Sequence, residues 1–320
     1  MLRHNIKIKE VKQLLQSFTE IKVCVVGDLI IDEYITCEAL GMSQEEPTIA
    51  VTPIDSTKFL GGAGIVAAHA AGLGAEVTLL SLRGKDATGE LAEEFLDRAG
   101  VVTYLVIDEN RLTTLKQRFR TKGKTLLKVN HLHKAAMNKS LQEQFIKGLR
   151  PIIKKMDVLV FSDFNYGCLP QELVEVIISL AKSNNVMLAA DSQSSSQIGD
   201  ISRFHGMDIV TPTEQEARIS TRNHEDGLVV LAETLRAQSQ AKNVLLKLGE
   251  EGLLINTVDQ EYVLLTDRIN ALNHSPRDVA GAGDSLLITT SLALASGANI
   301  WEASFLGSLA AAIQIGRVGN

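Results

Sequence analysis

The sequence is poor in cysteine, proline and aromatic residues. Of its 320 residues, three are cysteine, six are proline and 4% are aromatic. Cys24, Cys37 and Cys168 show no C-x-x-C spacing and no clustered histidine partner, so neither a disulfide framework nor a structural zinc site is indicated. The scarcity of aromatic residues, beside 24 glycines and many small aliphatic residues, favours alternating strands and helices over an aromatic-rich β-sandwich. The expected fold class is therefore α/β.

The sequence also lacks an excess of positive charge and an unbroken apolar segment. Its formal net charge is -6, which disfavours nucleic acid as a partner. Charged residues occur throughout residues 1–16, so this stretch predicts an amphipathic helix and not a signal peptide. Residues 285–301 carry no charge, but polar residues and Gly297 interrupt them, which favours a buried helix over a membrane span. We expect a cytoplasmic protein that binds no membrane.

Short aliphatic segments alternate with helical patterns along most of the chain. Strands are expected at residues 22–27, 76–81, 101–106, 156–161, 186–190, 208–210, 244–247 and 253–255. Helices are expected at residues 62–72, 87–98, 170–183, 225–237, 282–295 and 300–315. Strands that alternate with helices in this way predict a mostly parallel sheet.

Two stretches break this alternation, because polar and apolar residues alternate in them where a helix would be due. We expect these stretches to form a small antiparallel sheet that stands off the core as a lid. No low-complexity linker or internal repeat separates two independent domains. The lid would comprise residues 34–54 and 113–129, and the core residues 1–33, 55–112 and 130–320.

The strongest chemical signal is the segment 278–284, DVAGAGD, which leads directly into an apolar helix. Because Gly281 and Gly283 lack a Cβ atom, the backbone can turn sharply there and present consecutive amides at the helix N-terminus. Such amides stabilise negative charge on a phosphoryl group in transfer. Asp284 could take the proton from the attacking hydroxyl. Alternatively, the glycines only shape a loop and Asp284 caps the helix.

Two weaker signals lie nearer the N-terminus. Asp28 follows Gly27 at the end of the first expected strand, where ligands collect in a parallel sheet, and could accept hydrogen bonds from sugar hydroxyls. Alone, Asp28 could equally be a turn residue. The glycine-rich segment 61–64 permits close approach of a ligand to the backbone, or close packing of a helix.

In their order and separation, these motifs resemble those of the ribokinase-like (PfkB) family of carbohydrate kinases, from residue 21 to residue 320. The likeness is closest to the kinase domain of the ADP-heptose synthase type, which phosphorylates a heptose 7-phosphate at its anomeric hydroxyl. It is carried by GDLIIDEYI, SQEEPTIAV, GGAGIVAAHAAGLGAEVTLL, FSDFNYGCL, TPTEQEA, DVAGAGDSLL and EASFLGSLAAAIQIGRVGN. The resemblance implies a three-layer sandwich with a mostly parallel central sheet, a β-lid, and the use of ATP and Mg²⁺.

The resemblance also implies roles for individual residues. Asp284 corresponds to the catalytic base, and the amides of residues 281–283 form the anion hole. Glu216 matches an acidic residue that organises magnesium through water. The anion-hole residues are Gly281, Ala282 and Gly283, the sugar-binding residues are Asp28, Asp32 and Gly62, and the nucleotide-binding residues are Lys247, Gly249 and Thr213.

The lid region is basic. Lys116 and Arg118 match basic residues in the lid of the heptose kinases, where they would bind a phosphate that the substrate already carries. Because Arg120, Lys122 and Lys124 are also basic, an ordinary solvated lid strand is the alternative. The family further implies a homodimer that forms through the lids, and a fused or partner nucleotidyltransferase.

The sequence departs from the family pattern at four places. Ile65 stands where an asparagine commonly contacts sugar hydroxyls, and Thr213 replaces an asparagine of the metal-organising element. Residues 191–195 replace a loop that carries a basic residue, and Lys247 replaces a threonine, so Lys247 could restore the lost charge. The expected function is ATP-dependent phosphorylation of a sugar or sugar phosphate. The alternatives are a non-catalytic sugar or nucleotide sensor, and a kinase for a nucleoside or another small alcohol.

Overall fold

The computed structural model describes residues 3–194, 197–259, 261 and 263–319; Ser195, at the end of the 191–195 loop, lies outside them. The helices are α1 (Ile8–Ser17), α2 (Ala63–Gly72), α3 (Ala87–Arg98), α4 (Lys139–Ile153), α5 (Gln171–Ser183), α6 (Glu214–Thr221), α7 (Leu228–Ser239), α8 (Ala282–Ala295) and α9 (Ile300–Gln314). The strands are β1 (Lys22–Met42), β2 (Ile49–Gly62), β3 (Glu76–Gly84), β4 (Val102–Asp108), β5 (Thr114–Thr121), β6 (Lys124–His131), β7 (Val158–Asp163), β8 (Met187–Ser192), β9 (Ile209–Val210), β10 (Asn243–Lys247), β11 (Leu253–Val258) and β12 (Leu264–Ile269). Short 3₁₀ turns are η1 (Phe18–Glu20), η2 (Ile201–Arg203) and η3 (Gly249–Glu251).

The central sheet has the strand order β12-β11-β10-β9-β8-β7-β1-β3-β4. All neighbours from β10 to β4 are parallel, and β11 and β12 are antiparallel additions at one edge. The expected mostly parallel sheet is confirmed. In such a sheet the carboxyl ends of the parallel strands meet at one edge, which is where ligands collect.

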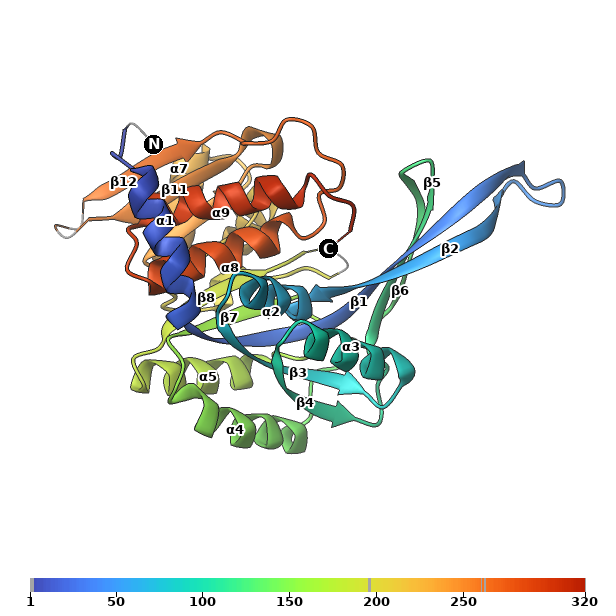
Figure 1. The fold of residues 1–320 in the computed structure, drawn as a ribbon, viewed down its shortest axis with the longest axis horizontal. Coiled ribbons are helices and arrows are strands. Elements are labelled where there is room, and N and C mark those ends of the chain that lie inside the picture. Colours follow the sequence, from blue (N-terminus) through green and yellow to red (C-terminus); the bar gives the residue numbers. More distant parts are fainter. Residues whose placement is uncertain (1–2, 195–196, 260, 262, 320) are drawn as a thin grey trace.

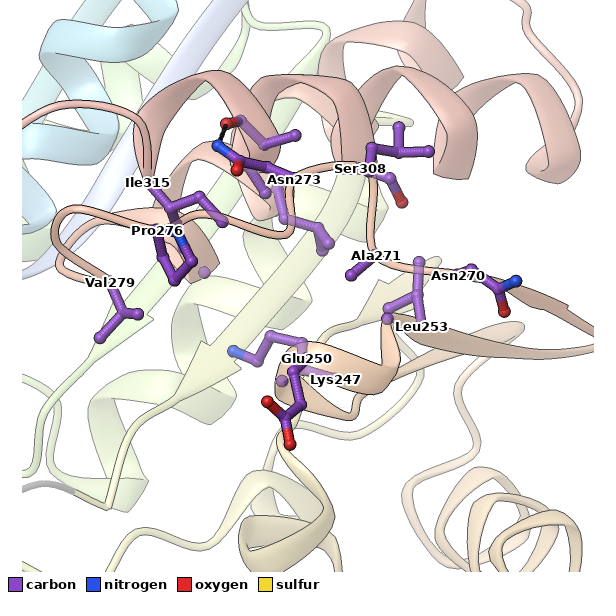
Figure 2. Close-up of a pocket in the computed structure, with 18 of the residues that line it drawn as sticks. Lys247, Glu250, Leu253, Asn270, Ala271, Asn273, Pro276, Val279, Ser308 and Ile315 are labelled. Atoms are coloured by element: carbon purple, nitrogen blue, oxygen red, sulfur yellow. Dashed lines mark hydrogen bonds between the residues drawn. The ribbon is translucent and has the colours of Figure 1, made fainter.

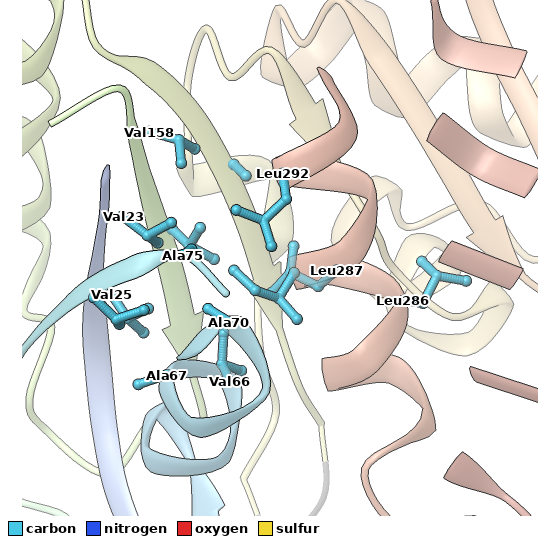
Figure 3. Packing of buried hydrophobic residues seen from close by; sticks show 14 of the residues in the cluster. Val23, Val25, Val66, Ala67, Ala70, Ala75, Val158, Leu286, Leu287 and Leu292 are labelled. Atoms are coloured by element: carbon cyan, nitrogen blue, oxygen red, sulfur yellow. The ribbon is translucent and has the colours of Figure 1, made fainter. Parts of the chain in front are cut away.

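Each face of this sheet is covered by helices and an apolar cluster. Val23 and Val25 of β1 belong to a cluster with α2, α8 and α9, which Figure 3 shows from close by. Cys24 and Val26 point to the other cluster, which contains residues of α4, α5 and α7. A strand buried on both faces reads as a continuous apolar run, which explains the sequence VCVV.

The lid is an extension of β1. The first part of β1, up to Asp28, pairs with β3 in the core, while the later part of β1 pairs with β2 and β5. The hairpin of β1 and β2 projects from the core (Figure 1). The paired lid strands lie within residues 29–62 and 114–131. The pairing of β1 with β5 is parallel, which corrects the expectation of an antiparallel sheet throughout.

Three elements had no counterpart in the expectations from sequence: α4, α6 and β12. Helix α4 begins after Asn138, whose side chain accepts a 3.0 Å hydrogen bond from the amide of Leu141, and Pro151 lies in its last turns. That proline obscured the helical pattern. Residues 285–301 form most of α8, a turn at Gly297 (φ 88°) and the start of α9. Within the described ranges, no helix is long and apolar enough to cross a bilayer.

Candidate functional site

The segment 278–284 forms a turn that opens helix α8. Gly281 lies at the N-cap position with φ 74°, a left-handed conformation that glycine adopts without steric cost, and Ala282 and Gly283 begin the helix. Amides in the first turn of a helix have no carbonyl partner within the helix. The three residues expected to form an anion hole therefore lie together at a helix N-terminus, where the dipole favours negative charge.

Asp284 is a buried carboxyl in the first turn of this helix. Gly281 occupies the cap position and no side chain caps the helix there, so the alternative that Asp284 is the cap residue is wrong. The side-chain amide of Gln193 donates a 3.0 Å hydrogen bond to Oδ1 of Asp284. Burial raises the pKa of Asp284 to about 7, the charge of Asp191 adds to the rise, and Lys247 opposes it. A carboxyl with this pKa can accept a proton near neutral pH.

Lys247, at the end of β10, supplies a cation beside the turn. Its Nζ lies 3.0 Å from both carboxylate oxygens of Asp191, and a Cβ atom built on Gly283 would lie 3.1 Å from the same Nζ. Although burial opposes it, the carboxylates of Asp191, Glu216 and Asp284 together raise the pKa of Lys247. The ammonium group therefore stays charged within reach of a phosphate at the helix N-terminus.

Thr213 and Glu216 form the capping box of helix α6. The amide of Thr213 donates to Oε2 of Glu216 at 2.7 Å, and the amide of Glu216 donates to Oγ1 of Thr213 at 3.2 Å. The other oxygen of Glu216 accepts a 3.0 Å hydrogen bond from the amide of Ser194. Glu216 thus holds the segment that carries Gln193 next to α6. Among the residues that the structure describes, no three His, Cys, Asp or Glu side chains gather into a metal site.

A cavity of about 610 Å³ opens beside the turn, between the 249–252 turn, the 270–276 loop and helices α8 and α9 (Figure 2). Lys247 and Gly283 line it at the end nearest Asp284, and Gly249 lines it as well; Thr213 does not. Most of the remaining lining is apolar. The lining residues are Lys247, Gly249, Glu250, Gly252, Leu253, Asn270, Ala271, Leu272, Asn273, His274, Pro276, Val279, Ala282, Gly283, Leu286, Ser308, Ala311, Ala312 and Ile315.

Asp28 is engaged by backbone amides. Its carboxylate accepts hydrogen bonds from the amides of Phe164 (2.8 Å), Cys168 (3.2 Å) and Tyr166 (3.4 Å), and it is almost fully buried. Burial raises the pKa of Asp28 to about 6, against the lowering effect of these amides. Asp28 therefore organises the loop after β7, and a contact with a sugar stays a prediction.

Asp32 lies against the glycine pair at the end of β2. A Cβ atom on Gly61 would lie 2.3 Å from Oδ2 of Asp32, and one on Gly62, whose φ is 55°, would lie 2.3 Å from the carbonyl oxygen of Asp28. The other oxygen of Asp32 is bound by the guanidinium group of Arg118 in an ion pair. Gly62 therefore allows the backbones of β1 and β2 to approach here, and Gly61 leaves room for the carboxylate of Asp32.

Lys116 and Arg118 face inward from β5. Lys116 is 7% exposed, and its Nζ lies 4.6 Å and 5.0 Å from the ring centroids of Phe164 and Tyr166. The charges of Asp32 and Lys116 raise and lower the pKa of Asp284, respectively, because both side chains lie near that carboxyl. For Lys116, the alternative of a solvated strand is wrong.

The sequence predicted no individual role for Gln193, Tyr34 or Phe164, although Gln193 belongs to the 191–195 loop noted above. Gln193 could have been found, because it follows the carboxyl end of β8, at the edge of the sheet where ligands collect. The side chain of Ile65, which stands where the family commonly has an asparagine, packs in an apolar cluster. His69, in the apolar helix α2, lies with Nδ1 2.9 Å from Oγ of Ser285.

Comparisons with known proteins agree with this arrangement. The model of the pfkB family of carbohydrate kinases matches residues 20–320. The bifunctional protein HldE of Helicobacter hepaticus is 30% identical over 303 residues, which cover 93% of this chain and 61% of that protein. HldE of Nitratiruptor sp. is 30% identical over 302 residues, which cover 93% of this chain and 62% of that protein. The chain thus spans less than two thirds of the length of these relatives.

Solved structures share the fold at lower sequence identity. The tetrameric inhibited form of phosphofructokinase-2 from Escherichia coli superposes with a TM-score of 0.74, at 20% identity, over 92% of this chain and 94% of that one. Arabidopsis thaliana ribokinase, complexed with ribose and ATP, gives a TM-score of 0.70 at 19% identity, over 93% of this chain and 94% of that one. The ribokinase-like fold expected from the sequence is confirmed.

Proposed function

Because this chain belongs to the pfkB family of carbohydrate kinases, we propose that it transfers the γ-phosphate of ATP to a hydroxyl group of a sugar phosphate. The finer assignment is a heptose 7-phosphate that is phosphorylated at its anomeric hydroxyl. The observation that carries the proposal is the position of Asp284, a buried carboxyl with a raised pKa, beside the amides of residues 281–283 at the N-terminus of α8.

The chemistry follows from this geometry. The acceptor oxygen attacks the γ-phosphorus while its proton passes to a carboxylate oxygen of Asp284. The bond from the γ-phosphorus to its bridging oxygen breaks, and ADP leaves with that electron pair. The amides of residues 281–283 and the ammonium group of Lys247 stabilise the charge on the transferred group. Gln193 holds the carboxylate of Asp284 through its 3.0 Å hydrogen bond.

The adjacent cavity is suited to ATP. Its volume of about 610 Å³ lies within the usual range for small-molecule sites, and its apolar walls can bury a purine ring. With the base between the 270–276 loop and α9, the phosphates would extend toward Lys247 and Gly283 (Figure 2). This orientation brings the γ-phosphate next to Asp284.

Magnesium would arrive with ATP. Mg²⁺ keeps several waters and is commonly held by one or two carboxylates and the nucleotide phosphates, which suits a site whose described residues offer no three-ligand cluster. Glu216 would contact its waters, since both of its oxygens already accept backbone hydrogen bonds. The ion would neutralise charge on the phosphates during transfer.

The acceptor would bind under the lid, between Asp32 and Asp284. Lys116 and Arg118 are the cations on this side, and a phosphate on the acceptor could bind them by charge-assisted hydrogen bonds. This supports a phosphorylated sugar over a free one. A nucleoside or another small alcohol would be favoured if Ile65 gave the acceptor an apolar contact, but the side chain of Ile65 packs in the core.

The lid also supports a homodimer. Large apolar side chains on its projecting hairpin are 60–65% exposed, and a second copy could cover them. They are Leu40, Met42, Ile49 and Ile54. A change of Met42 and Ile49 to lysine should convert a dimer to a monomer in light scattering. Because the relatives are bifunctional and longer, a nucleotidyltransferase is proposed as the fused or partner activity.

A screen for ADP release tests the proposed function. The protein would be incubated with ATP, Mg²⁺ and a panel of sugars and sugar phosphates, including a heptose 7-phosphate. Turnover with phosphorylated sugars and little with free sugars is expected. Binding of nucleotide and sugar without turnover would instead identify the non-catalytic sensor, and turnover with nucleosides would identify the other alternative.

A further inference from the structure

The carboxylate of Asp278 connects the lid to the turn that opens α8. Its Oδ1 accepts a 3.1 Å hydrogen bond from the amide of Ala280, within the turn. Its Oδ2 accepts a 2.9 Å hydrogen bond from the hydroxyl of Tyr34, on the lid portion of β1. A guanidinium nitrogen of Arg120, on the lid strand β5, lies 3.8 Å from the same oxygen. One side chain thus touches two lid strands and the turn.

The same carboxylate also binds the C-terminal segment. The amide of Gly319 donates a 3.2 Å hydrogen bond to Oδ2 of Asp278. The side-chain amide of Gln314, in α9, donates to the carbonyl oxygens of Gly319 at 3.0 Å and of Ala280 at 3.3 Å. Phe59 of β2 packs so closely on Gly319 that a Cβ atom there would lie 2.6 Å from its ring. The turn is therefore braced on one side by α9 and on the other by the lid.

Asp278 is ionised in this setting. Burial works against the charge, but the Ala280 amide, the Tyr34 hydroxyl and the Gly319 amide hold the pKa of Asp278 below its usual range. Hydrogen bonds to an ionised acceptor are stronger than neutral ones. The side chains of Asp278 and Arg120 are 14% and 15% exposed, so water replaces a lost donor only in part.

A continuous series of contacts leads from the acceptor side to this carboxylate. Arg118, which pairs with Asp32, lies with its guanidinium carbon 5.2 Å from the ring centroid of Tyr34. The guanidinium carbon of Arg120 lies 4.6 Å from the same centroid. The ring of Tyr34 therefore contacts the cation of the acceptor side and the cation beside Asp278.

We propose that Asp278 is a positioning residue through which the lid sets the geometry of the anion hole. Tyr34 and Arg120 hold its carboxylate, and the carboxylate holds the backbone of the turn that presents the amides of Gly281–Gly283. Acceptor binding under the lid and phosphate binding at the turn then strengthen each other, and by linkage the coupling is equal in both directions. The inference rests on the proposed function, since it takes these amides to bind the nucleotide phosphates.

The test measures nucleotide affinity after changes in the lid and at Asp278. A non-hydrolysable ATP analogue with Mg²⁺ would be titrated calorimetrically into the wild type, Tyr34→Phe, Asp278→Asn and the double variant. Tyr104→Phe is the matched control, because the Tyr104 hydroxyl binds the carbonyl oxygen of Gln144 at 3.3 Å, outside the lid and the turn. Thermal melting of each variant verifies that it folds.

Tyr34→Phe should raise the dissociation constant of the analogue about 5-fold or more, with the melting temperature within a degree or two of the wild type, and Tyr104→Phe should leave affinity unchanged. The double variant should bind no more weakly than Asp278→Asn. Wild-type affinity in Tyr34→Phe, or additive losses in the double variant, would overturn the inference. Should Asp278→Asn fail to fold, Tyr34→Phe alone decides.

The titration needs no acceptor, so its outcome is separate from that of the ADP-release screen. A protein that bound nucleotide through this coupling but phosphorylated no sugar would retain the inference and lose the proposed function. If the protein is an active kinase and Tyr34→Phe leaves its nucleotide affinity unchanged, the inference is wrong and the proposed function is retained.

Discussion

The ammonium group of Lys247 lies 3.0 Å from both carboxylate oxygens of Asp191, at the carboxyl ends of β10 and β8, which lie on either side of β9 in the sheet. The two side chains are 14% and 2% exposed. Burial raises the pKa of Asp191 to about 6, while the charge of Lys247 opposes the rise. The pair therefore places a fixed cation next to Gly283, and its partner keeps that cation in position.

Loss of the lysine should affect both stability and nucleotide binding. Lys247→Met leaves the buried carboxyl of Asp191 without its cation, which should lower the free energy of unfolding by about 3–5 kcal/mol. Asp191→Asn combined with Lys247→Met should recover most of that loss in urea titrations, while affinity for an ATP analogue stays reduced. Wild-type nucleotide affinity in the double variant would show that Lys247 does not contact phosphate.

The rate of turnover should depend on pH near neutrality. Asp284 must be ionised to accept a proton, and its pKa is raised to about 7, first by burial and then by Asp191. We therefore expect kcat to fall as the pH is lowered through about 7. The initial rate of ADP release, measured between pH 5.5 and 9, tests this expected fall in kcat. If the chemical step is rate-limiting, a kcat that stays constant down to pH 5.5 would exclude Asp284 as the base.

The same pKa sets a pH dependence of stability. The pKa of Asp284 is about 7 in the folded state, whereas its ordinary value is 3.8. Between these two values the folded state holds a proton that the unfolded state releases. The stability contributed by Asp284 is greatest below pH 4 and is lost as the pH rises toward 7. Asp284→Asn should therefore be more stable than the wild type at pH 8, on the order of 2 kcal/mol, and the difference should shrink at pH 4.

How much of this site the sequence could predict differs from residue to residue. Gly281, Gly283 and Asp284 were placed correctly at a helix start, because glycine before an apolar helix is a local signal. The contact between Gln193 and Asp284 joins residues 91 positions apart, and no local pattern encodes it. The same holds for Tyr34 and Asp278, which are 244 positions apart.

The fold was predictable where local pattern and tertiary context agree. The limits of α3 and α8 match the expectation from sequence, since a stop or start residue flanks each. The strand expected at residues 22–27 and the extended lid segment expected from residue 34 are one continuous strand, β1, so only residues 28–33 of it were not predicted. Helix α6 was missed, as only two turns follow its capping box.

The inward-facing lid arginine should decide between phosphorylated and free acceptors. Arg118→Gln removes the guanidinium group that pairs with Asp32, and should raise KM for a sugar phosphate about 10- to 100-fold. KM for the corresponding free sugar should change much less. Arg98→Gln, at an exposed pair with Glu94 on α3, is the matched control. Equal effects on both acceptors would exclude a phosphate contact by Arg118.

Packing between α8 and α9 should matter for the site, because α8 carries Asp284. A Cβ atom on Gly307 would lie 2.1 Å from Oγ1 of Thr290 and 3.0 Å from the carbonyl oxygen of Leu286. Gly307→Ala should lower the free energy of unfolding by about 1–3 kcal/mol and reduce kcat. At Gly72, where a Cβ atom meets open space, alanine should be neutral or stabilising. Equal melting temperatures for both variants would contradict this packing argument.

Turnover by Asp284→Asn tests the account most directly. The amide cannot accept the hydroxyl proton, so kcat in ADP release should fall by about 10²- to 10⁴-fold, while circular dichroism and binding of the ATP analogue stay close to the wild type. Asp97→Asn, at an exposed position of α3, should keep full activity. If Asp284→Asn phosphorylated its acceptor at the wild-type rate, with chemistry rate-limiting, Asp284 would not be the base.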